Sequence, residues 1–339
     1  MYGGKKMKQI TDSNYTVAIA GHVRPDGDCI GSCMAVYWYI KENYPNIKPQ
    51  VYLEEILPEF SYLAGIEDVL HREDTPIVYD LFLALDCGDK ERLGEMKDCF
   101  ERAKRTISVD HHISNANYAM ENLIVPDAAA TCEILFYKMD YEKISQKTAT
   151  ALYTGLVHDT GVFKYSNTTE KTMIAAGKLI SKGVAFSEII DESFFQRTYL
   201  QHQILGRALL ESIRFFDKKC IAAVLRKKEL DFYGVNSGDL SGIVSQLALT
   251  KGVECAIFIY ETSPHVFRVS LRSKSYVDVS AIAKHFGGGG HIRAAGCTMM
   301  GSEHDVINNI SSQIEIQIEK LEARKSREER TGETVCTME

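Results

Sequence analysis

The stretch TVAIAGHVRPDGDCIGS, residues 16–32, decides the fold of the first half of this chain. It begins with an apolar run that is typical of a strand buried on both faces. Pro25 and Gly27 then interrupt the strand with a loop, so side chains there can converge instead of alternating across a sheet. Three of those side chains belong to types that bind metal ions: His22, Asp26 and Asp28. The residues from about 29 to 41 predict a helix directly after the loop.

Two further strands follow, and each ends in an aspartate. VYDLFLALD (residues 78–86) closes with Asp86, and RTISVD (residues 105–110) closes with Asp110. ENLIVPD, residues 121–127, is a candidate fourth strand. Helices are predicted after these strands, at residues 129–139 and 145–158. The alternation predicts an α/β domain built on a mostly parallel sheet with flanking helices.

The second half of the chain mixes helices and strands in a different order. Helices are predicted at residues 170–181, 186–207, 239–250, 279–285 and 303–322. Strands are predicted in ESIRFF, CIAAVLR, ECAIFIY and VFRVSLRS. We therefore expect four regions: a metal-binding catalytic domain at 1–187, a connecting helix at 188–205, a smaller α+β domain at 206–325, and a polar, disordered tail at 326–339. The substrate is expected in a cleft between the two domains.

Charge and hydropathy limit the partners. Acidic residues outnumber basic ones, 46 to 39, which gives a net charge of −7. Proteins that grip long nucleic acid usually present a basic surface, so any nucleic-acid partner is expected to be short rather than a long duplex. No apolar run approaches the roughly 20 residues that span a bilayer. The first 15 residues lack the apolar core of a signal peptide, and we expect a cytoplasmic protein without membrane partners.

The cysteine pattern agrees with a reducing compartment. The nine cysteines are scattered, odd in number and without a C-x-x-C pair, so we expect free thiols rather than a disulfide framework. Cys29 and Cys33 lie four residues apart on a predicted helix. Two thiols alone make a poor zinc site, and both are interpreted as small buried residues.

Carboxylates and imidazoles recur where the predicted strands and helices end. Beside the first loop stand three more clusters: Asp86 in ALDCGD, Asp110-His111-His112, and His158-Asp159 in GLVHDTGVF. Any one cluster alone could simply cap a helix or form a turn. Ligands of open α/β sheets bind at the carboxyl ends of the strands, and several carboxylates gathered there repel one another unless cations lie between them. Mixed carboxylate and imidazole ligands favour Mn²⁺, and a pair of such ions serves phosphoryl chemistry.

These segments resemble the motifs of a known superfamily. HVRPDGDCIGS, ALDCGD, VDHHISN and GLVHDTGVF resemble, in order, the four motifs of the DHH phosphoesterases, and FGGGGHIRAAG resembles the signature of the DHH-associated domain. The resemblance spans residues 22–296. It implies that His22 and Asp26 hold one divalent metal and that Asp28, His111 and Asp159 hold the other. It further implies that Asp86 bridges the two ions.

The resemblance also implies roles for residues that do not bind metal. Asp110 would orient an imidazole, as carboxylates do beside metal-bound histidines. His112 would donate to a phosphoryl oxygen or protonate the leaving group as a general acid. His158 has no fixed role in the motif, and we interpret it as a packing residue.

The second domain is expected to grip the substrate. A run of four glycines exposes backbone N–H groups in a way that suits phosphate, and these are Gly287, Gly288, Gly289 and Gly290. His291 and Arg272 can both reach anionic oxygen, Arg272 in bidentate fashion. Arg268 shares the strand face of Arg272 and is a weaker candidate. Three aromatic residues able to stack on a base, Phe163, Tyr165 and Phe286, are interpreted mainly as core residues.

The sequence thus predicts a stand-alone, two-metal phosphodiesterase or phosphatase for very short nucleotides. Within the superfamily it resembles the NrnA-like group, which implies short RNA, dinucleotides such as pApA and 3′-phosphoadenosine 5′-phosphate as substrates. The alternative enzyme is a soluble cyclic-dinucleotide phosphodiesterase acting on cyclic di-AMP. A non-catalytic nucleotide-binding protein is less favoured because no carboxylate of the motifs is missing. The sequence leaves the oligomeric state open, and a homodimer is compatible with it.

Overall fold

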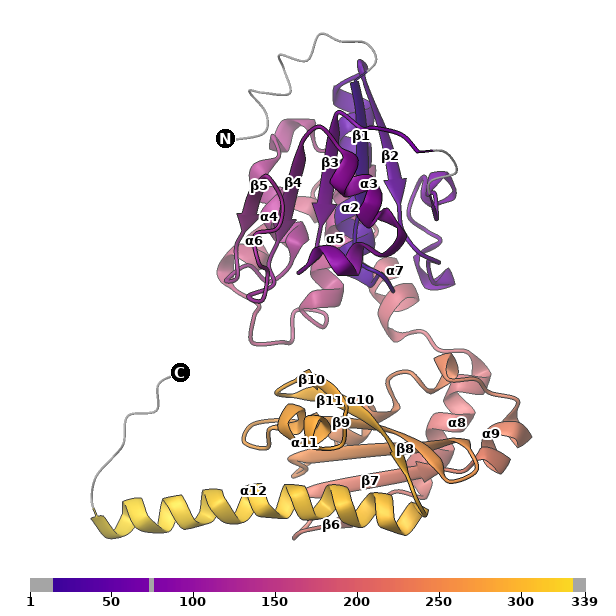
Figure 1. Ribbon diagram of the computed structural model, residues 1–339, viewed down its shortest axis with the longest axis vertical. Helices are drawn as coiled ribbons and strands as arrows, with labels where there is room; N and C mark the ends of the chain where they lie inside the picture. The colour runs from indigo at the N-terminus through magenta and orange to yellow at the C-terminus, as the bar shows by residue number, and fades with distance from the viewer. Residues whose placement is uncertain (1–14, 73–75, 332–339) are drawn as a thin grey trace. The chain divides into compact units, whose positions relative to one another are not determined.

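The chain divides into two compact units (Figure 1). The structure, a computed structural model, describes residues 15–72 and 76–331. Unit 1 comprises Met1–Gln196 and unit 2 comprises Arg197–Glu339. The division falls inside the segment that the sequence analysis assigned to a connecting helix. The N-terminal stretch examined for a signal peptide lies almost entirely outside the described residues.

Unit 1 is built on a five-stranded parallel sheet in the order β2-β1-β3-β4-β5. The strands are β1 (Tyr15–Ala20), β2 (Ile47–Tyr52), β3 (Leu81–Leu85), β4 (Thr106–Asp110) and β5 (Glu121–Ile124). This confirms the predicted α/β class with a parallel sheet. All five residues of β3 are buried, as expected of a central strand covered on both faces.

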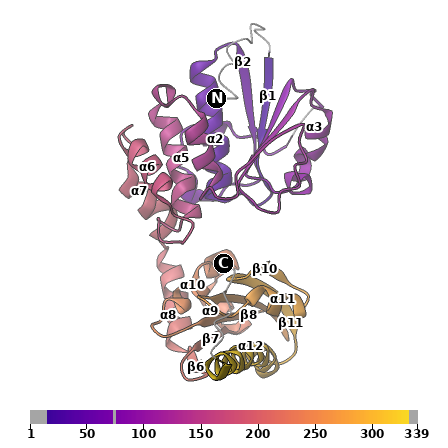
Figure 2. The same ribbon diagram turned by 90° about the vertical axis from the view of Figure 1, so that its left-hand side faces the viewer.

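Helices cover both faces of this sheet (Figure 2). They are α2 (Gly27–Asn43), α3 (Lys97–Arg102), α4 (Thr131–Lys138), α5 (Gln146–Asp159), α6 (Glu170–Ile180) and α7 (Phe186–Ile190). Alternate residues of the strands serve the two layers. Val17 and Ile19 of β1 join the cluster that includes α2, α4 and α5, whereas Ala18 and Ala20 join the cluster that includes α3. The period of two in the strands therefore builds one hydrophobic core on each side of the sheet.

Unit 2 is a six-stranded sheet in the order β10-β11-β9-β8-β7-β6. The strands are β6 (Ile213–Phe215), β7 (Cys220–Leu225), β8 (Cys255–Ser263), β9 (Val266–Ser273), β10 (Gly289–His291) and β11 (Ala294–Met300). Only the β7–β8 pair is parallel among the described strands of this sheet. The mixed sheet with its helices confirms the predicted smaller α+β unit.

The helices of unit 2 lie on both faces of its sheet. They are α8 (Tyr199–Leu210), α9 (Lys227–Tyr233), α10 (Ile243–Ala248), α11 (Val279–His285) and α12 (Glu303–Thr331). Residues of α11 and α12 share one core cluster with Val269, Leu271 and Cys297. On the other face, residues of α8 and α10 share a cluster with Ala256 and Phe258 of β8. That second cluster holds no residue of β9, β10 or β11.

Three predictions of local structure are corrected. The helix predicted at 186–207 is broken, because α7 leads into a π-helical turn (Asp191–Phe195) and α8 begins anew after Thr198, whose side chain accepts a hydrogen bond from Gln201 N. Strands β2, β10 and β11 were not predicted, since IKPQVY contains proline and AAGCTMM is rich in alanine and glycine. Helix α12 continues to Thr331, into the predicted tail, and residues 332–339 lie outside the described part.

Two other predictions concern the state of the cysteines and the presence of membrane-spanning helices. All eight cysteines within the described residues are free and buried, Cys29 and Cys33 included. Among the described residues no helix combines the length and the apolar character needed to cross a bilayer.

The buried Glu254 fastens the loop that precedes α11. Its carboxylate accepts hydrogen bonds from the backbone N–H groups of Ser275, Tyr276 and Val277 and from the Ser275 hydroxyl. Burial alone would raise the pKa of Glu254, but these hydrogen bonds outweigh it and lower the pKa. Its stabilising effect is therefore present above the pKa of the unfolded chain and is lost as the pH falls through the folded value.

We expect Glu254→Ala to destabilise unit 2 by about 3 kcal/mol, because several hydrogen-bond donors, the buried Val277 N–H among them, lose their acceptor at once. Urea unfolding of the full chain at neutral pH measures this loss. Glu315→Ala, which removes an exposed carboxylate of α12, is the matched control and should change stability by less than about 0.5 kcal/mol. Equal stability of the two variants would contradict the role assigned to Glu254.

Candidate metal centre

The loop after β1 directs two carboxylates and one imidazole toward the carboxyl end of the sheet. Asp26 is the N-cap of α2 and accepts hydrogen bonds from Asp28 N and Cys29 N. His22 is buried, and its Nδ1 lies 2.9 Å from Val23 O. A carbonyl oxygen can only accept, so Nδ1 carries the hydrogen and Nε2 is left for a ligand. His22 Nε2 lies 3.6 Å from an oxygen of Asp26 and 3.6 Å from an oxygen of Asp86.

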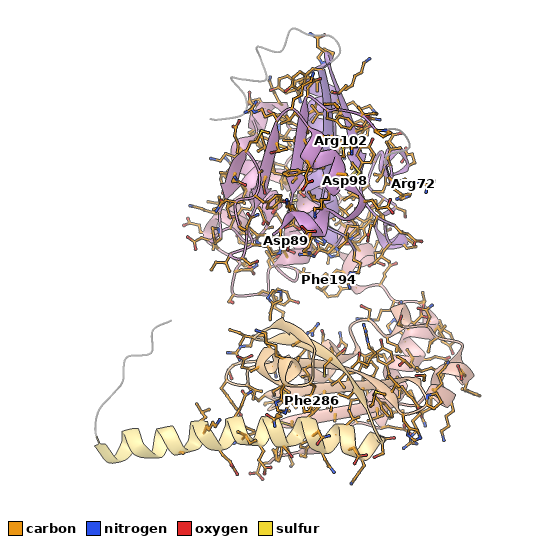
Figure 3. All side chains as sticks on the ribbon, viewed as in Figure 1. Arg72, Asp89, Asp98, Arg102, Phe194 and Phe286 are labelled. Carbon is orange, nitrogen blue, oxygen red and sulfur yellow. The ribbon has the colours of Figure 1, made fainter. Side chains whose placement is uncertain are left out.

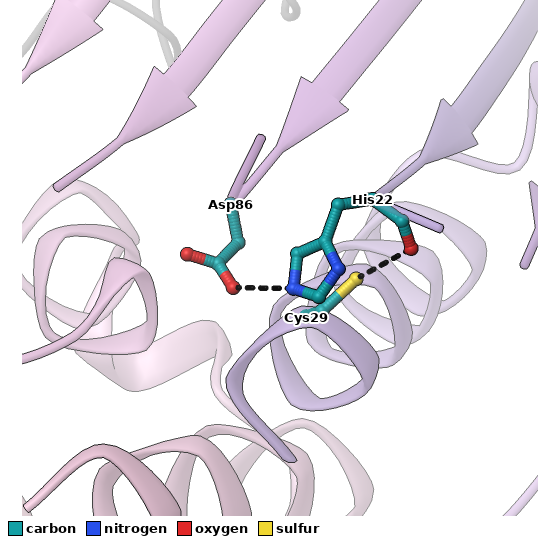
Figure 4. A group of neighbouring side chains, drawn as sticks. All are labelled: His22, Cys29 and Asp86. Atoms are coloured by element: carbon teal, nitrogen blue, oxygen red, sulfur yellow. Dashed lines mark hydrogen bonds and ion pairs between the residues drawn. The ribbon is translucent and has the colours of Figure 1, made fainter. Parts of the chain in front are cut away.

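Asp86 lies between two imidazoles of the cluster, and Figure 4 shows it beside His22 and Cys29. It follows β3 directly, is 2% exposed and has a φ of 53°. A non-glycine residue in this left-handed region is uncommon, and such strain is often found at functional sites. One carboxylate oxygen lies 3.6 Å from His22 Nε2 and the other 3.6 Å from His111 Nε2. Asp86 therefore faces an imidazole on each side, which is the placement that a bridging ligand requires.

Asp28, His111 and Asp159 form a second group, whose ligand atoms all lie within 4.8 Å of one another. His111 Nε2 is 3.1 Å from an oxygen of Asp159. His111 Nδ1 lies 3.3 Å from Ala128 O, to which it donates. The three residues come from the start of α2, the end of β4 and the end of α5. Segments far apart in the sequence thus converge at one edge of the sheet.

The electrostatics of the cluster suit divalent cations. Burial and the charge of Asp159 raise the pKa of Asp28 to about 7. Burial and the charges of Asp28 and Asp159 also raise the pKa of Asp86 well above its usual value. Burial would lower the pKa of His111, but its hydrogen bond to Asp159 and the charge of Asp28 raise it to about 9. Carboxylates that repel one another while sharing histidine partners match the donor set that a divalent ion would accept.

Asp110 and His112 form a separate pair at the rim of the cluster. Asp110 accepts hydrogen bonds from His112 Nδ1 at 2.7 Å and from Asn115 Nδ2 at 2.7 Å. It also accepts from the backbone N–H groups of His111 and His112. The imidazole that Asp110 orients is thus that of His112, whereas His111 is held by a backbone carbonyl. His112 Nδ1 also lies 3.7 Å from Asp86, and Asp86, His111 and His112 make up a third group able to hold an ion.

His158 turns away from the cluster, in agreement with the packing interpretation. Its Nε2 lies 3.0 Å from the Ser193 hydroxyl, and its ring packs against Phe60 and Phe194. Burial lowers the pKa of His158 to about 4. The ring also fills the space beside Gly27, where a Cβ atom would lie 2.2 Å from it. A neutral, partly buried His158 therefore supports the turn between Asp26 and Asp28.

Three residues that the sequence analysis did not single out hold carboxylates of the cluster in place. At the start of α4, Thr131 N and Cys132 N donate to Asp28 at 2.6 and 3.0 Å, and Thr131 Oγ1 donates to Asp86 at 3.0 Å. Asn115 holds Asp110, as described above. The amino end of a helix favours negative charge, so α4 stabilises Asp28 as a carboxylate. The helix predicted at 129–139 was the only available signal for this contact.

The predicted substrate residues lie together in unit 2. Arg272 of β9 pairs with Ala294 of β11, and Ala294 pairs with His291 of β10. Directly opposite residues project to the same face of a sheet, so the Arg272 and His291 side chains share one face.

The glycine run has a more structural role than predicted. The N–H groups of Gly287 and Gly288 donate to Lys284 O and Ala283 O and so end α11. Gly288 has no room for a side chain, since a Cβ atom would meet Gly296 O at 2.2 Å. Only Gly289 and Gly290 of the run continue into the edge strand β10. The N–H groups of Gly287 and Gly288 are thus engaged within the protein, and phosphate binding stays a prediction for Gly289, Gly290 and His291.

Two of the three aromatic residues that were interpreted mainly as core residues pack against a core, and the third does not. Phe163 packs against the core of unit 1, and Phe286 packs against the core of unit 2, where Figure 3 shows it among the side chains near α11. Tyr165 is 54% exposed, so it is a surface residue rather than a core residue.

Comparisons with known proteins bear on both units. The family model described as DHH family, N-terminal domain, matches residues 16–156, and the model described as DHHA1 domain matches residues 217–320. The bifunctional oligoribonuclease and PAP phosphatase NrnA of Bacillus subtilis (strain 168) is 27% identical over 290 residues, which cover 84% of this chain and 89% of the relative. The protein of the same name from Thermus thermophilus is 29% identical over 296 residues, which cover 85% and 86%.

A solved structure has the same fold over both units. The crystal structure of an exopolyphosphatase-related protein from Bacteroides fragilis matches with a TM-score of 0.83 and 24% identity. The match covers 92% of this chain and 94% of that one.

Proposed function

Since this chain belongs to the DHH family and carries a DHHA1 domain, we propose that it is a two-metal phosphoesterase that hydrolyses very short oligoribonucleotides. Its further substrates would be dinucleotides such as pApA and 3′-phosphoadenosine 5′-phosphate. The curated relatives named oligoribonuclease and PAP phosphatase support this substrate class. The observation that carries the proposal is the position of Asp86 between His22 and His111, with further carboxylates on both sides.

We take the ligand sets of the two ions from the motifs that the chain shares with the family. His22 and Asp26 would hold one ion, and Asp28, His111 and Asp159 the other, with Asp86 shared between them. The mixture of carboxylate and imidazole favours Mn²⁺. Bound there, the ions would activate a water molecule and neutralise charge on the phosphoryl group.

His112 is suited to donate a proton to the departing oxygen. The Asp110 carboxylate accepts from its Nδ1 at 2.7 Å, which fixes the ring and leaves Nε2 for the substrate. Asn115 and two backbone N–H groups hold that carboxylate in turn. His112 is 28% exposed, which leaves it accessible to a bound phosphate ester. We therefore assign general acid catalysis to His112 and its orientation to Asp110.

The substrate residues of unit 2 would bind phosphate and define the short-substrate preference. The side chains of Arg272 and His291 share one sheet face, and the two glycines belong to β10, a strand at the edge of the sheet. At a net charge of −7 the chain offers little electrostatic help to a long polyanion. We place this activity in the cytoplasm, where short RNA fragments arise.

Activity on substrates of increasing length tests the proposal. With Mn²⁺ present, kcat/KM should fall steeply for RNA beyond about five nucleotides, and duplexes should resist hydrolysis, because few phosphates are gripped. The assay compares pApA, 3′-phosphoadenosine 5′-phosphate, cyclic di-AMP and RNA of two, three, five and twenty-four nucleotides. Preference for cyclic di-AMP would favour the alternative cyclic-dinucleotide phosphodiesterase. Equal or faster hydrolysis of the longest RNA would rule out the short-substrate reading.

A further inference from the structure

On one face of the unit 2 sheet, α10 lies against β8 and β9, and the hydrophobic core cluster beneath it ends at β8. On this face, α8 and α10 share a cluster with residues of β7 and β8, but β9, β10 and β11 contribute nothing to it. The side chains that β9 and β11 send to this face are exposed or partly buried. Met300, at the end of β11, is 81% exposed. We call the exposed part of this face, around Arg268 of β9 and Thr298 of β11, the open face.

A cross-strand row of three polar side chains leads from the edge of the core cluster onto the open face. Tyr260 of β8 pairs with Arg268 of β9, and Arg268 pairs with Thr298 of β11. Directly opposite residues project to the same side of a sheet, so the phenol ring, the guanidinium group and the hydroxyl are neighbours. Arg268 and Thr298 are exposed, and Tyr260 is partly buried.

Tyr260 is held as a rigid aromatic surface. Its ring is stacked on that of Phe258, with centroids 5.8 Å apart and planes inclined by 29°. Phe258 is 2% exposed and belongs to the core cluster beneath. The ring of Tyr260 is thus supported from one side by the core. Aromatic side chains supported in this way on a sheet face are the platforms on which single-stranded bases stack.

Arg268 is an arginine without a competing acid. Within the described part of the chain its guanidinium group makes no hydrogen bond or ion pair. The residues opposite and diagonal to it on β8 are Phe258, Tyr260 and Thr262, and those on β11 are Gly296, Thr298 and Met300. None of these neighbours is acidic. An exposed arginine beside a hydroxyl, with no carboxylate to neutralise it, is suited to bind a phosphate.

The row lies apart from Arg272, the residue proposed to bind the first phosphate. Arg268 precedes Arg272 by four residues on the same strand and projects to the same face. At about 3.3 Å per residue, the two arginines start roughly 13 Å apart along β9. Ser270 and Gly296 lie between them, and both are partly buried and polar or small. One nucleotide held at Arg272 does not reach the row, so a longer single strand is needed to occupy both.

We propose that Tyr260, Arg268 and Thr298 form a second nucleotide subsite for single-stranded RNA longer than a dinucleotide. The base would stack on Tyr260, and the phosphate would bind Arg268 and the Thr298 hydroxyl. The inference rests on the proposed function, because it takes Arg272 and His291 as the grip for the first nucleotide. Through this subsite, the open face would strengthen the binding of longer single-stranded RNA relative to that of dinucleotides.

Binding measured at two substrate lengths tests the subsite. The full chain carrying Asp86→Asn, which should not hydrolyse its ligand, is titrated into fluorescently labelled five-nucleotide RNA and into labelled pApA, and anisotropy gives Kd. Adding Arg268→Ala should raise the Kd of the five-nucleotide RNA about tenfold, as expected for loss of a hydrogen bond to a charged group. The Kd of pApA should stay nearly constant, so the Kd of the five-nucleotide RNA divided by the Kd of pApA should rise by nearly the same factor. Tyr260→Leu should change that ratio in the same direction.

Arg214→Ala is the matched control, since Arg214 is an exposed arginine on β6 at the far edge of the same sheet. It should leave the ratio unchanged. An equal rise in Kd for both ligands after Arg268→Ala, or no rise for either, would overturn the second subsite. Because binding is read without turnover, failure of the wild-type chain to hydrolyse any substrate would count against the proposed function alone.

Discussion

Replacing Asp86 by asparagine is expected to lower kcat by more than about a hundredfold, the order of loss seen when one group that stabilises developing charge is removed. Asp86 faces His22 on one side and His111 on the other, both at 3.6 Å. Its substitution would therefore remove a negative ligand from both proposed ion positions at once. Steady-state kinetics with pApA at saturating Mn²⁺, together with metal analysis of the purified variant, measures the effect.

The same substitution should stabilise the metal-free protein at neutral pH. Burial and the neighbouring carboxylates raise the pKa of Asp86, so the folded chain retains a proton that the unfolded chain has already released. In that interval the folded state loses stability as the pH rises. Thermal unfolding in a chelator should therefore show wild-type stability falling from pH 5 to pH 8, and a smaller fall for Asp86→Asn. Added Mn²⁺ should stabilise the wild type more than the variant.

Asp98→Asn is the control for both measurements, because Asp98 is an exposed residue of α3 (Figure 3). It should change neither kcat nor the pH dependence of unfolding. Near-normal turnover of Asp86→Asn at saturating Mn²⁺ would show that the bridging assignment is wrong.

The arrangement of the cluster of carboxylates and imidazoles was predictable because the carboxyl ends of parallel strands lie at one edge of their sheet. Asp86 and Asp110 stand at the ends of β3 and β4, and the loop with Asp26 follows β1. Once the strands were recognised as apolar runs, these side chains had to lie at one edge. The ligands that come from helices, Asp159 above all, were placed there by the family resemblance rather than by periodicity.

What holds those ligands could not be read from the sequence. Asp28 accepts hydrogen bonds from Thr131 N and Cys132 N in the first turn of α4. Nearly every residue type has a backbone N–H group, so the residue types do not reveal such a contact. For the same reason, the sequence analysis predicted that Asp110 orients an imidazole but did not say which histidine carries it. The choice of His112 over His111 depends on the turn after β4, where Asn115 closes on Asp110.

The second unit was harder to predict because its strands lack the usual signals. Strand β11 is composed of small and sulfur-containing residues, AAGCTMM, and β10 is nearly all glycine. Strand β11 forms on the edge of β9, and β10 forms on the edge of β11. Both have a non-local cause that no local propensity captures. The open face exists only once those strands are paired, which is why Arg268 gained importance from the structure and not from the sequence.

His112→Ala is expected to lower kcat by about a hundredfold, the usual contribution of a positioned general acid, and to leave KM nearly unchanged. The Asp110 carboxylate holds its Nδ1 at 2.7 Å, so alanine removes the proton donor without displacing the ring of a metal ligand. Arg272→Ala should show the opposite pattern, with a raised KM and a nearly unchanged kcat, since it would lose phosphate binding in the ground state. Kinetics with pApA over a range of concentrations separates the two.

Metal content decides between the two roles open to His112. Its Nδ1 lies 3.7 Å from Asp86, and it belongs with Asp86 and His111 to a group able to hold an ion. The short bond to Asp110 argues for the acid, because that bond engages Nδ1, the nitrogen nearest Asp86. His112→Ala should therefore retain as many Mn²⁺ ions per chain as the wild type, whereas His111→Ala should lose one. An ion lost from His112→Ala would make this residue a ligand and assign the proton transfer to another group.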